Sequence, residues 1–299
     1  MEDEKLKRLI LWAKENKIPE DAKKMLYLPS IVGIPRDVEK LKNLTELLLP
    51  ELELEELPEE LFSLSNLKRL NLSDNRLKEI PEEIANLKNL ENLDVSNNRI
   101  KKFPKVFQEL KKIKVLSFEN NQIDTFEFEF KYLKEIWLEG NSFTSFPSAL
   151  LQSQRLAVIS FGGNPFSIFP NEIAAFKNLT DLWVNNAKFI QIDFDFSILK
   201  KLKYVIFTDG NLEFFPEGLC KCKNLVEINF ENNALTEIPS CFQELENLKY
   251  AFFIDNRIKV IPSFLVEMKK LEEINFEGNL IENIDNCLQK KLEEDIILY

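Results

Sequence analysis

Apolar and polar positions along this chain recur with a period of 23 residues. The recurring pattern is L-x-x-L-x-L-x-x-N-x-L-x-x-I-P-x-x-I-x-x-L-x-x, and the only interval that differs is the one of 20 residues between Ile113 and Leu133. Eleven repeats begin at Leu44, Leu67, Leu90, Ile113, Leu133, Leu156, Leu179, Leu202, Leu225, Leu248 and Leu271. A partial repeat precedes them and has matching residues at Ile31, Ile34, Pro35, Val38 and Leu41. This regularity predicts a stack of similar structural units.

The pattern within one repeat predicts a short strand followed by a turn. In L-x-x-L-x-L the apolar residues alternate, so the fourth and sixth positions point into the core and the third and fifth point away from it. The proline at the fifteenth position can continue neither a β-ladder nor a helix interior, so it turns the chain across the opposite side. Because no single repeat can bury its apolar face alone, stacked repeats with parallel strands form one continuous core.

The step N-x-L-x-x-[IL]-P in these repeats resembles the typical leucine-rich repeats of Ras-suppressor-like, Scribble-like and bacterial cytosolic or effector proteins. The resemblance covers about residues 21–284. It implies an α/β fold, namely a right-handed, horseshoe-shaped leucine-rich-repeat solenoid with a parallel sheet on its concave side. The convex side is expected to carry irregular or 3-10 turns and short strands, and the ends are expected to carry helical caps. For function, the resemblance implies a scaffold for protein–protein recognition without enzymatic activity.

The ends of a solenoid must be covered, because the terminal repeats would otherwise expose the core. We expect an N-terminal capping helix in residues 1–20, a domain of a partial repeat plus eleven repeats in residues 21–284, and a C-terminal cap in residues 285–299. The first helix is predicted by apolar residues at helical spacing, namely Leu6, Leu9, Ile10 and Ala13. The C-terminal cap begins at Asp285, a favourable N-cap residue. Residues 296–299 form either part of this cap or a docking tail, and we expect the cap.

Two convex segments depart from the repeat pattern. Residues 126–130 and 192–196 lack the proline and alternate phenylalanine or isoleucine with acidic residues. A period of two is typical of β-strands, so the sequence predicts a short convex strand in each segment.

The composition narrows the chemistry that the chain can perform. The chain has no histidine, which removes Ser-His-Asp triads, Cys-His dyads and histidine metal sites. It has only 7 glycines, and neither GxGxxG nor GxxxxGK[ST] occurs, so nucleotide-phosphate loops have no support. We therefore expect no enzymatic activity, no cofactor and no metal ion.

The net charge and the first residues bear on partners and location. The chain has 50 Asp+Glu against 39 Lys+Arg, a formal charge of −11, which disfavours nucleic acid and membrane surfaces and favours a basic partner. The first twenty residues carry charges throughout and lack the apolar core of a signal peptide, and no stretch approaches the ~18 apolar residues of a membrane span. We expect a cytoplasmic protein, with specialised export as an effector as the alternative.

The four cysteines lie in the C-terminal third, at Cys220, Cys222, Cys241 and Cys287. A zinc site at Cys220-x-Cys222 would need two more converging ligands. Cys222 stands where other repeats have leucine, which indicates a small core residue instead. A reducing compartment is the simplest inference from this pattern.

Asparagine recurs at the ninth position of the repeat, at Asn75, Asn98, Asn121, Asn141, Asn164, Asn233, Asn256 and Asn279. A buried amide can both donate to and accept from backbone groups of neighbouring turns. The column therefore predicts a structural ladder rather than a set of catalytic amides.

Binding is expected at the third and fifth positions of each strand, which face solvent on the concave side. Trp137 and Trp183 occupy the fifth position two repeats apart, so their indoles would stand ~10 Å apart and flank a groove for a side chain or extended peptide. The candidate binding residues are Trp137, Trp183, Ser160, Val158, Tyr204, Ile206, Tyr250, Phe252, Glu135 and Asp181. The alternative is that these large residues only pack against their neighbours along the sheet.

These observations favour a non-enzymatic scaffold that recognises a partner protein or peptide, with a basic surface, on its concave face. One alternative is recognition of a glycan or small ligand in the tryptophan-lined groove. Another is a bacterial effector that acts on a host protein. The sequence leaves the oligomeric state open.

Overall fold

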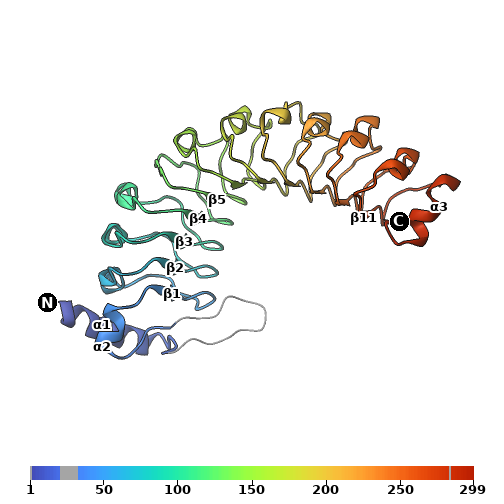
Figure 1. Cartoon of the computed structure of the whole chain (residues 1–299). Coiled ribbons are helices and arrows are strands. Elements are labelled where there is room, and N and C mark those ends of the chain that lie inside the picture. Colours follow the sequence, from blue (N-terminus) through green and yellow to red (C-terminus); the bar gives the residue numbers. More distant parts are fainter. Residues whose placement is uncertain (1, 21–32, 283) are drawn as a thin grey trace. The chain divides into compact units, whose positions relative to one another are not determined.

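The computed structural model describes residues 2–20, 33–282 and 284–299 (Figure 1). Ile31 of the predicted partial repeat lies outside these residues. The chain divides into two compact units. Unit 1 comprises Met1–Ser142 and Pro147–Arg155, and unit 2 comprises Phe143–Phe146 and Leu156–Tyr299.

Unit 1 is built from short parallel strands on one side and 3-10 helices on the other (Figure 1). In its described residues the strands pair in chain order and are β1 (Glu46–Leu48), β2 (Arg69–Asn71), β3 (Asn92–Asp94), β4 (Val115–Ser117) and β5 (Glu135–Trp137). The 3-10 helices are η1 (Glu59–Ser63), η2 (Glu82–Asn86), η3 (Lys105–Glu109) and η4 (Ser148–Gln152). In the part of unit 1 that the structure describes, the α-helices α1 (Glu2–Glu15) and α2 (Val38–Lys42) precede the strands.

Unit 2 repeats the same arrangement. Its strands also pair in parallel in chain order and are β6 (Val158–Ser160), β7 (Asp181–Trp183), β8 (Tyr204–Ile206), β9 (Glu227–Asn229), β10 (Tyr250–Phe252), β11 (Glu273–Asn275) and β12 (Ile297–Leu298). The 3-10 helices of its described part are η5 (Asn171–Ala175), η6 (Phe196–Ile198), η7 (Glu217–Lys221), η8 (Ser240–Glu244), η9 (Ser263–Glu267) and η10 (Asn286–Leu288). One α-helix, α3 (Gln289–Glu293), follows η10. The strand and turn pattern predicted from the repeat is therefore confirmed.

The core of each unit consists of equivalent apolar positions stacked side by side. In unit 2 the sixth position is phenylalanine in consecutive repeats, and the ring centroids of Phe230 and Phe253 lie 6.0 Å apart while those of Phe253 and Phe276 lie 5.6 Å apart. All three rings are fully buried. Parallel pairing without a register shift brings the same position of each repeat together, so a phenylalanine column becomes a stack of rings.

The asparagine column joins successive repeats through backbone hydrogen bonds. Asn98 is 7% exposed, and its Oδ1 accepts from the amide of Leu77 in the preceding repeat at 2.9 Å. Its Nδ2 donates to the carbonyls of Leu72, Val95 and Ser96 at 3.0, 3.0 and 3.1 Å. One amide thus satisfies buried backbone groups of two repeats, which confirms the predicted structural role.

The two predicted convex strands are wrong. The backbone of residues 126–130 forms no strand, and residues 196–198 belong to η6. The burial still alternates, with Phe126 and Phe130 buried and the acidic residues between them exposed. A strand also needs a partner for its ladder, and the neighbouring turns of the same units are 3-10 helices, which offer none.

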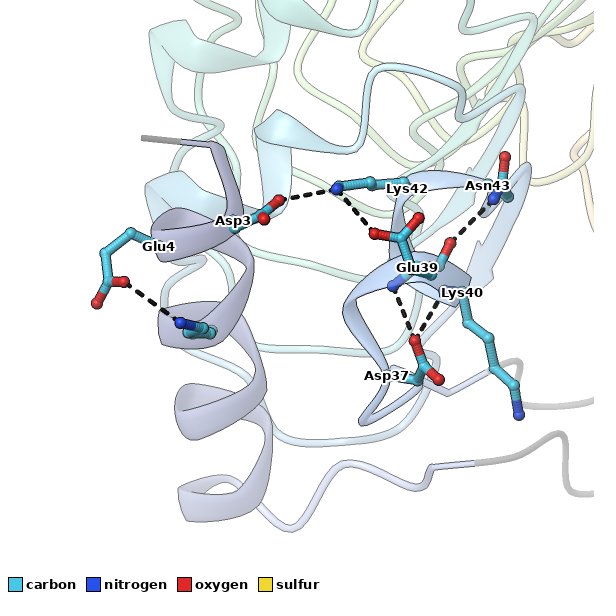
Figure 2. A network of polar contacts seen from close by, with 8 residues as sticks. Asp3, Glu4, Asp37, Glu39, Lys40, Lys42 and Asn43 are labelled. Atoms are coloured by element: carbon cyan, nitrogen blue, oxygen red, sulfur yellow. Dashed lines mark hydrogen bonds and ion pairs between the residues drawn. The ribbon is translucent and has the colours of Figure 1, made fainter.

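Helix α1 packs its apolar face against the first repeats of unit 1. Leu6, Leu9 and Ala13 are fully buried, and Arg8 forms an ion pair with Glu60 of η1 at 2.7 Å. Polar contacts also link α1 to α2, because Lys42 lies between Asp3 at 2.8 Å and Glu39 at 2.9 Å (Figure 2).

Helix α2 starts at a side-chain cap. The carboxylate of Asp37 accepts from the amides of Glu39 and Lys40 at 2.8 and 3.3 Å, which satisfies two of the amides left unpaired at a helix start (Figure 2). Near the other end of the chain, Asp285 is the N-cap of η10, and its side chain accepts from the amide of Cys287 at 2.9 Å. The last residues then pair with β11 as strand β12, with Ile297 buried.

Candidate binding site

The strand face of each unit is the side of the sheet that carries the third and fifth positions of the repeat. The parallel register aligns each position with the same position of the next strand. In unit 2 this places Trp183, Ile206, Asn229, Phe252 and Asn275 in one row. A second row consists of Asp181, Tyr204, Glu227, Tyr250 and Glu273. Equivalent positions of successive repeats therefore lie side by side on the sheet, as the sequence predicted.

The aromatic face of unit 2 comprises Val158, Asp181, Trp183, Tyr204, Tyr250 and Phe252, all of which are half-buried on the strand face. Glu227 and Asn229 of β9 divide this face into two groups of apolar side chains. The Asn229 side chain accepts from the amide of Glu231 at 2.8 Å, so it has a local structural role between the two groups. The face combines partly exposed rings with carboxylates, which suits a partner that has both apolar and basic groups.

Two predicted members of this site are not available at the surface. Ser160 is fully buried and Ile206 is only 9% exposed. Both lie next to Trp183 in the register, because β7 pairs with β6 on one side and with β8 on the other. A large ring in the row covers smaller neighbours ~4.8 Å away, so part of the predicted surface is packing along the sheet.

Tyr250 has its hydroxyl fixed by a neighbouring strand segment. The hydroxyl donates to a carboxylate oxygen of Glu272 at 2.5 Å, and Lys249 also pairs with Glu272 at 2.5 Å. The hydrogen bond to Glu272 raises the pKa of the Tyr250 phenol, whereas the hydrogen bond from Lys249 lowers the pKa of Glu272. The ring of Tyr250 is therefore held in a defined orientation at the edge of the aromatic face.

Trp137 and Glu135 belong to β5 of unit 1, whereas Trp183 belongs to unit 2. The groove predicted between the two indoles therefore stays a prediction. Within unit 1, Trp137 borders a different feature that the sequence reasoning missed. This feature, the Asp94 hollow, has a volume of about 380 Å³ and is lined by Leu48, Arg69, Leu70, Asn71, Asn92, Leu93, Asp94, Val115, Ser117, Glu119 and Trp137.

Asp94 lies half-buried in this hollow. Its carboxylate accepts from the amide of Ser96 at 3.0 Å and from Nδ2 of Asn71 at 3.2 Å. Burial raises the pKa of Asp94, and the hydrogen bonds from Ser96 lower it by less. The carboxylate is thus held by neutral donors in a partly desolvated place.

Asp94 should make the protein less stable as the pH rises. Below the ordinary carboxyl pKa of 3.8 the group is protonated in both the folded and the unfolded chain, so its ionisation does not lower the free energy of unfolding. As the pH rises through 3.8 and then through the raised pKa, the unfolded chain loses the proton first, and the free energy of unfolding falls. We expect Asp94→Asn to match the wild type in acid and to exceed its stability at neutral pH, measured by denaturant unfolding across pH.

A variant in which the pH dependence of stability should have the opposite sign serves as the control for this measurement. Asp195 accepts hydrogen bonds from Ser197, which lower the pKa of its carboxylate. Its contribution is present above the ordinary carboxyl value and is lost as the pH falls through the lowered pKa. Asp195→Asn should therefore be less stable than the wild type at neutral pH and equal to it in strong acid. A constant difference for Asp94→Asn across pH would contradict the prediction.

Exposed apolar side chains also gather away from the strand face of unit 2. Ile168, Ile190 and Phe214 are 73%, 56% and 54% exposed and border two hollows of about 450 and 420 Å³. The two hollows share Gln191 and Asp193. The signal was present in the sequence, because the thirteenth position of the repeat is polar in the earlier repeats and apolar at Ile168 and Phe214.

The cysteines do not form the pattern that the sequence suggested. Cys220 and Cys241 form a disulfide between consecutive repeats, so the inference of a reducing compartment loses its basis. Cys222 is buried, its thiol donates to the carbonyl of Phe196 at 3.3 Å, and burial raises its pKa to about 12. Its assignment as a core residue is confirmed.

The described residues lack two other kinds of feature, a metal-binding cluster and a membrane-spanning helix. No group of three or more His, Cys, Asp or Glu side chains is placed to hold a metal ion. In the same part of the chain, no helix has both the length and the apolar character needed to cross a bilayer.

The chain matches two models of leucine-rich-repeat sequences. Residues 60–125 match the leucine-rich repeat region, and residues 173–293 match the BspA type leucine rich repeat region. Together these segments span more than half of the chain. No curated protein matches it.

Solved structures share the same fold. A leucine-rich-repeat protein of Leptospira interrogans is 24% identical, with 87% of this chain and 85% of that chain covered and a TM-score of 0.57. An internalin of Listeria monocytogenes is 18% identical, with 96% and 77% covered and a TM-score of 0.68. A TDR receptor is 25% identical with a TM-score of 0.60; the match covers 82% of this chain and 49% of the receptor chain, about half. The repeat pattern, the parallel strands with 3-10 turns and these matches show that the chain belongs to the leucine-rich repeat family.

Proposed function

We propose that the protein is a non-enzymatic scaffold that binds a partner protein or peptide through its strand face, with the aromatic face of unit 2 as a principal contact. The observation that carries this proposal is the group of partly exposed rings on two adjacent rows of the strand face, at Trp183, Tyr204, Tyr250 and Phe252. These positions point away from the core, so their rings are not needed to fill it. Tryptophan and tyrosine are the residues that most often dominate interface energies.

The family and the charge support the same function. Leucine-rich-repeat domains typically act as protein-binding scaffolds, and one of the similar structures is named as a receptor. The formal charge of −11 and the carboxylates of Asp181 and Glu227 beside the rings favour a partner with a basic surface. Residues 1–20 and 285–299 would then act as caps of a recognition domain formed by residues 21–284.

The disulfide bears on the compartment in which this function is performed. Disulfides persist in oxidising environments and are rare in the cytosol, so the Cys220–Cys241 pair favours an oxidising compartment over the cytoplasm. This observation supports the form of the proposal in which the protein is exported from the cytoplasm.

Replacement of Trp183 by alanine should weaken partner binding by at least ~2 kcal/mol, because a half-buried indole in an interface is a typical hot spot. The partner is first identified by crosslinking and mass spectrometry with the full chain, and its affinity for the variants is then measured by surface plasmon resonance. The association rate should also fall as salt is added, because the carboxylates of the face attract a basic partner.

The matched control is Phe214→Ala, which removes an exposed aromatic ring that does not lie on the strand face. Its affinity should equal that of the wild type. Unchanged affinity in Trp183→Ala with the fold intact would remove the aromatic face from the proposal. Binding of glycans on an array, with no protein crosslinked, would replace a protein partner by a carbohydrate one.

A further inference from the structure

We infer that the Asp94 hollow in unit 1 is a pocket for one basic side chain, a lysine or an arginine, of the partner. This inference rests on the proposed function, because it names the chemical group that the strand face of unit 1 would receive. It concerns residues on β1 to β5 and Glu119, which follows β4, and none of them belongs to the aromatic face of unit 2.

The shape of the hollow follows from the sizes of the residues in one row. The register aligns Leu48, Asn71, Asp94, Ser117 and Trp137 across β1 to β5. The side chains in the middle of the row are small, and those at its ends are large. The row therefore encloses a depression between two apolar walls, and its volume of about 380 Å³ lies within the ~300–1,000 Å³ usual for ligand pockets.

Asp94 gives the hollow a negative charge at its centre. In the described part of the chain, the carboxylate of Asp94 forms no ion pair with a lysine or arginine, and its hydrogen-bond donors are neutral. Arg69, the basic residue of the lining, is paired with Glu46 at 2.8 Å. Glu119 adds a second carboxylate to the lining. A partly desolvated carboxylate of this kind gains most from an incoming cation, because the local dielectric is lower than that of water.

The rest of the lining suits the remaining parts of a lysine or arginine side chain. Trp137 contributes an aromatic ring to the lining, and the faces of such rings attract ammonium and guanidinium groups. Leu48 and Val115 provide apolar surface for the methylene stem. An anionic group would be repelled by Asp94 and Glu119, and a purely apolar group would cover the polar floor without bonding to it.

The test uses the full chain and three blocked tripeptides that differ in one side chain: Gly-Arg-Gly, Gly-Lys-Gly and the neutral Gly-citrulline-Gly. Binding is followed by the NMR signals of the Trp137 indole and the backbone amides of Asp94 and Ser117. The arginine and lysine peptides should shift these signals, and the citrulline peptide should not. The ratio of the two basic peptides' affinities decides which side chain the pocket prefers.

The variant Asp94→Asn tests the role of the charge. Asparagine keeps an oxygen that can accept from the amide of Ser96, so the local turn is preserved while the negative charge is removed. We expect the affinity for the basic peptides to fall roughly tenfold or more. Asp124→Asn removes an exposed carboxylate of unit 1 outside the lining and should leave the affinity unchanged.

Three outcomes would overturn the inference: no shift with either basic peptide, equal binding of the citrulline peptide, or undiminished binding by a folded Asp94→Asn variant. Its failure is distinct from failure of the proposed function. If the peptides fail to bind but Trp183→Ala still weakens the partner complex, the scaffold function stands without this pocket. If the basic peptides bind through Asp94 but no partner is found, the pocket stands and the scaffold function fails.

Discussion

Replacement of Asn98 by alanine is expected to lower the free energy of unfolding by at least roughly 3 kcal/mol. The substitution leaves the buried amide of Leu77 without its acceptor and takes a donor from the carbonyls of Leu72, Val95 and Ser96. Each buried polar group that loses its partner costs about 1–3 kcal/mol. The side chain is 7% exposed, so the backbone groups that it satisfies lie away from bulk water.

The measurement is chemical denaturation followed by far-ultraviolet circular dichroism, with Asn86→Ala as the control. Asn86 is exposed on η2, and its replacement should change stability by no more than ~0.5 kcal/mol. The variant Asn98→Asp separates the contribution of the accepted hydrogen bond from that of the donated ones. Its carboxylate can still accept from the amide of Leu77 but cannot donate to the three carbonyls. Equal midpoints for the alanine variants at positions 98 and 86 would show that the backbone groups find other partners.

Removal of the disulfide is the second large effect that we expect. Cys220 on η7 is joined to Cys241 on η8, and the pair closes a loop with a sequence separation of 21. Cross-linking a loop of this size restricts the unfolded chain, and its loss costs about 3 kcal/mol. The double variant Cys220→Ser with Cys241→Ser should therefore unfold at a lower denaturant concentration than the wild type.

Addition of a reductant provides the internal control for this prediction. It should lower the stability of the wild type to that of the double variant and leave the double variant unchanged. The control substitution is Cys287→Ser, which removes an exposed cysteine outside the disulfide and should have little effect. Alkylation of all four cysteines in the unreduced, unfolded wild type would show that the pair is not oxidised and would also remove the argument for an oxidising compartment.

The sequence predicted most of the fold because the repeat carries its information locally. Alternation in L-x-x-L-x-L defined each strand, and the fixed period placed equivalent residues such as Phe253 and Phe276 beside each other. The asparagine column was predictable for the same reason, since a buried amide at a fixed offset from the strand meets the same backbone groups in every repeat. Register errors were excluded because a shift by one residue would turn every apolar side chain toward solvent.

The candidate site was predicted only in part. The alignment of the third and fifth positions into rows is present, yet Ser160 and Ile206 are buried because their exposure depends on the size of Trp183 in the adjacent strand. The Asp94 hollow was missed, although its residues belong to those rows, because a polar residue in one strand gives no sign of a depression. The depression exists only when Leu48 and Trp137 stand at the ends of the row.

The sequence by itself therefore determined the period, the strands and the positions that face the core. Tertiary structure decided which surface positions are open, that Cys220 meets Cys241, and that residues 126–130 do not form a strand. The physical reason is that inward-facing positions are set by alternation along one repeat. Exposure, disulfide pairing and strand formation on the convex side depend instead on the neighbouring repeats, whose side chains and backbone supply the partners.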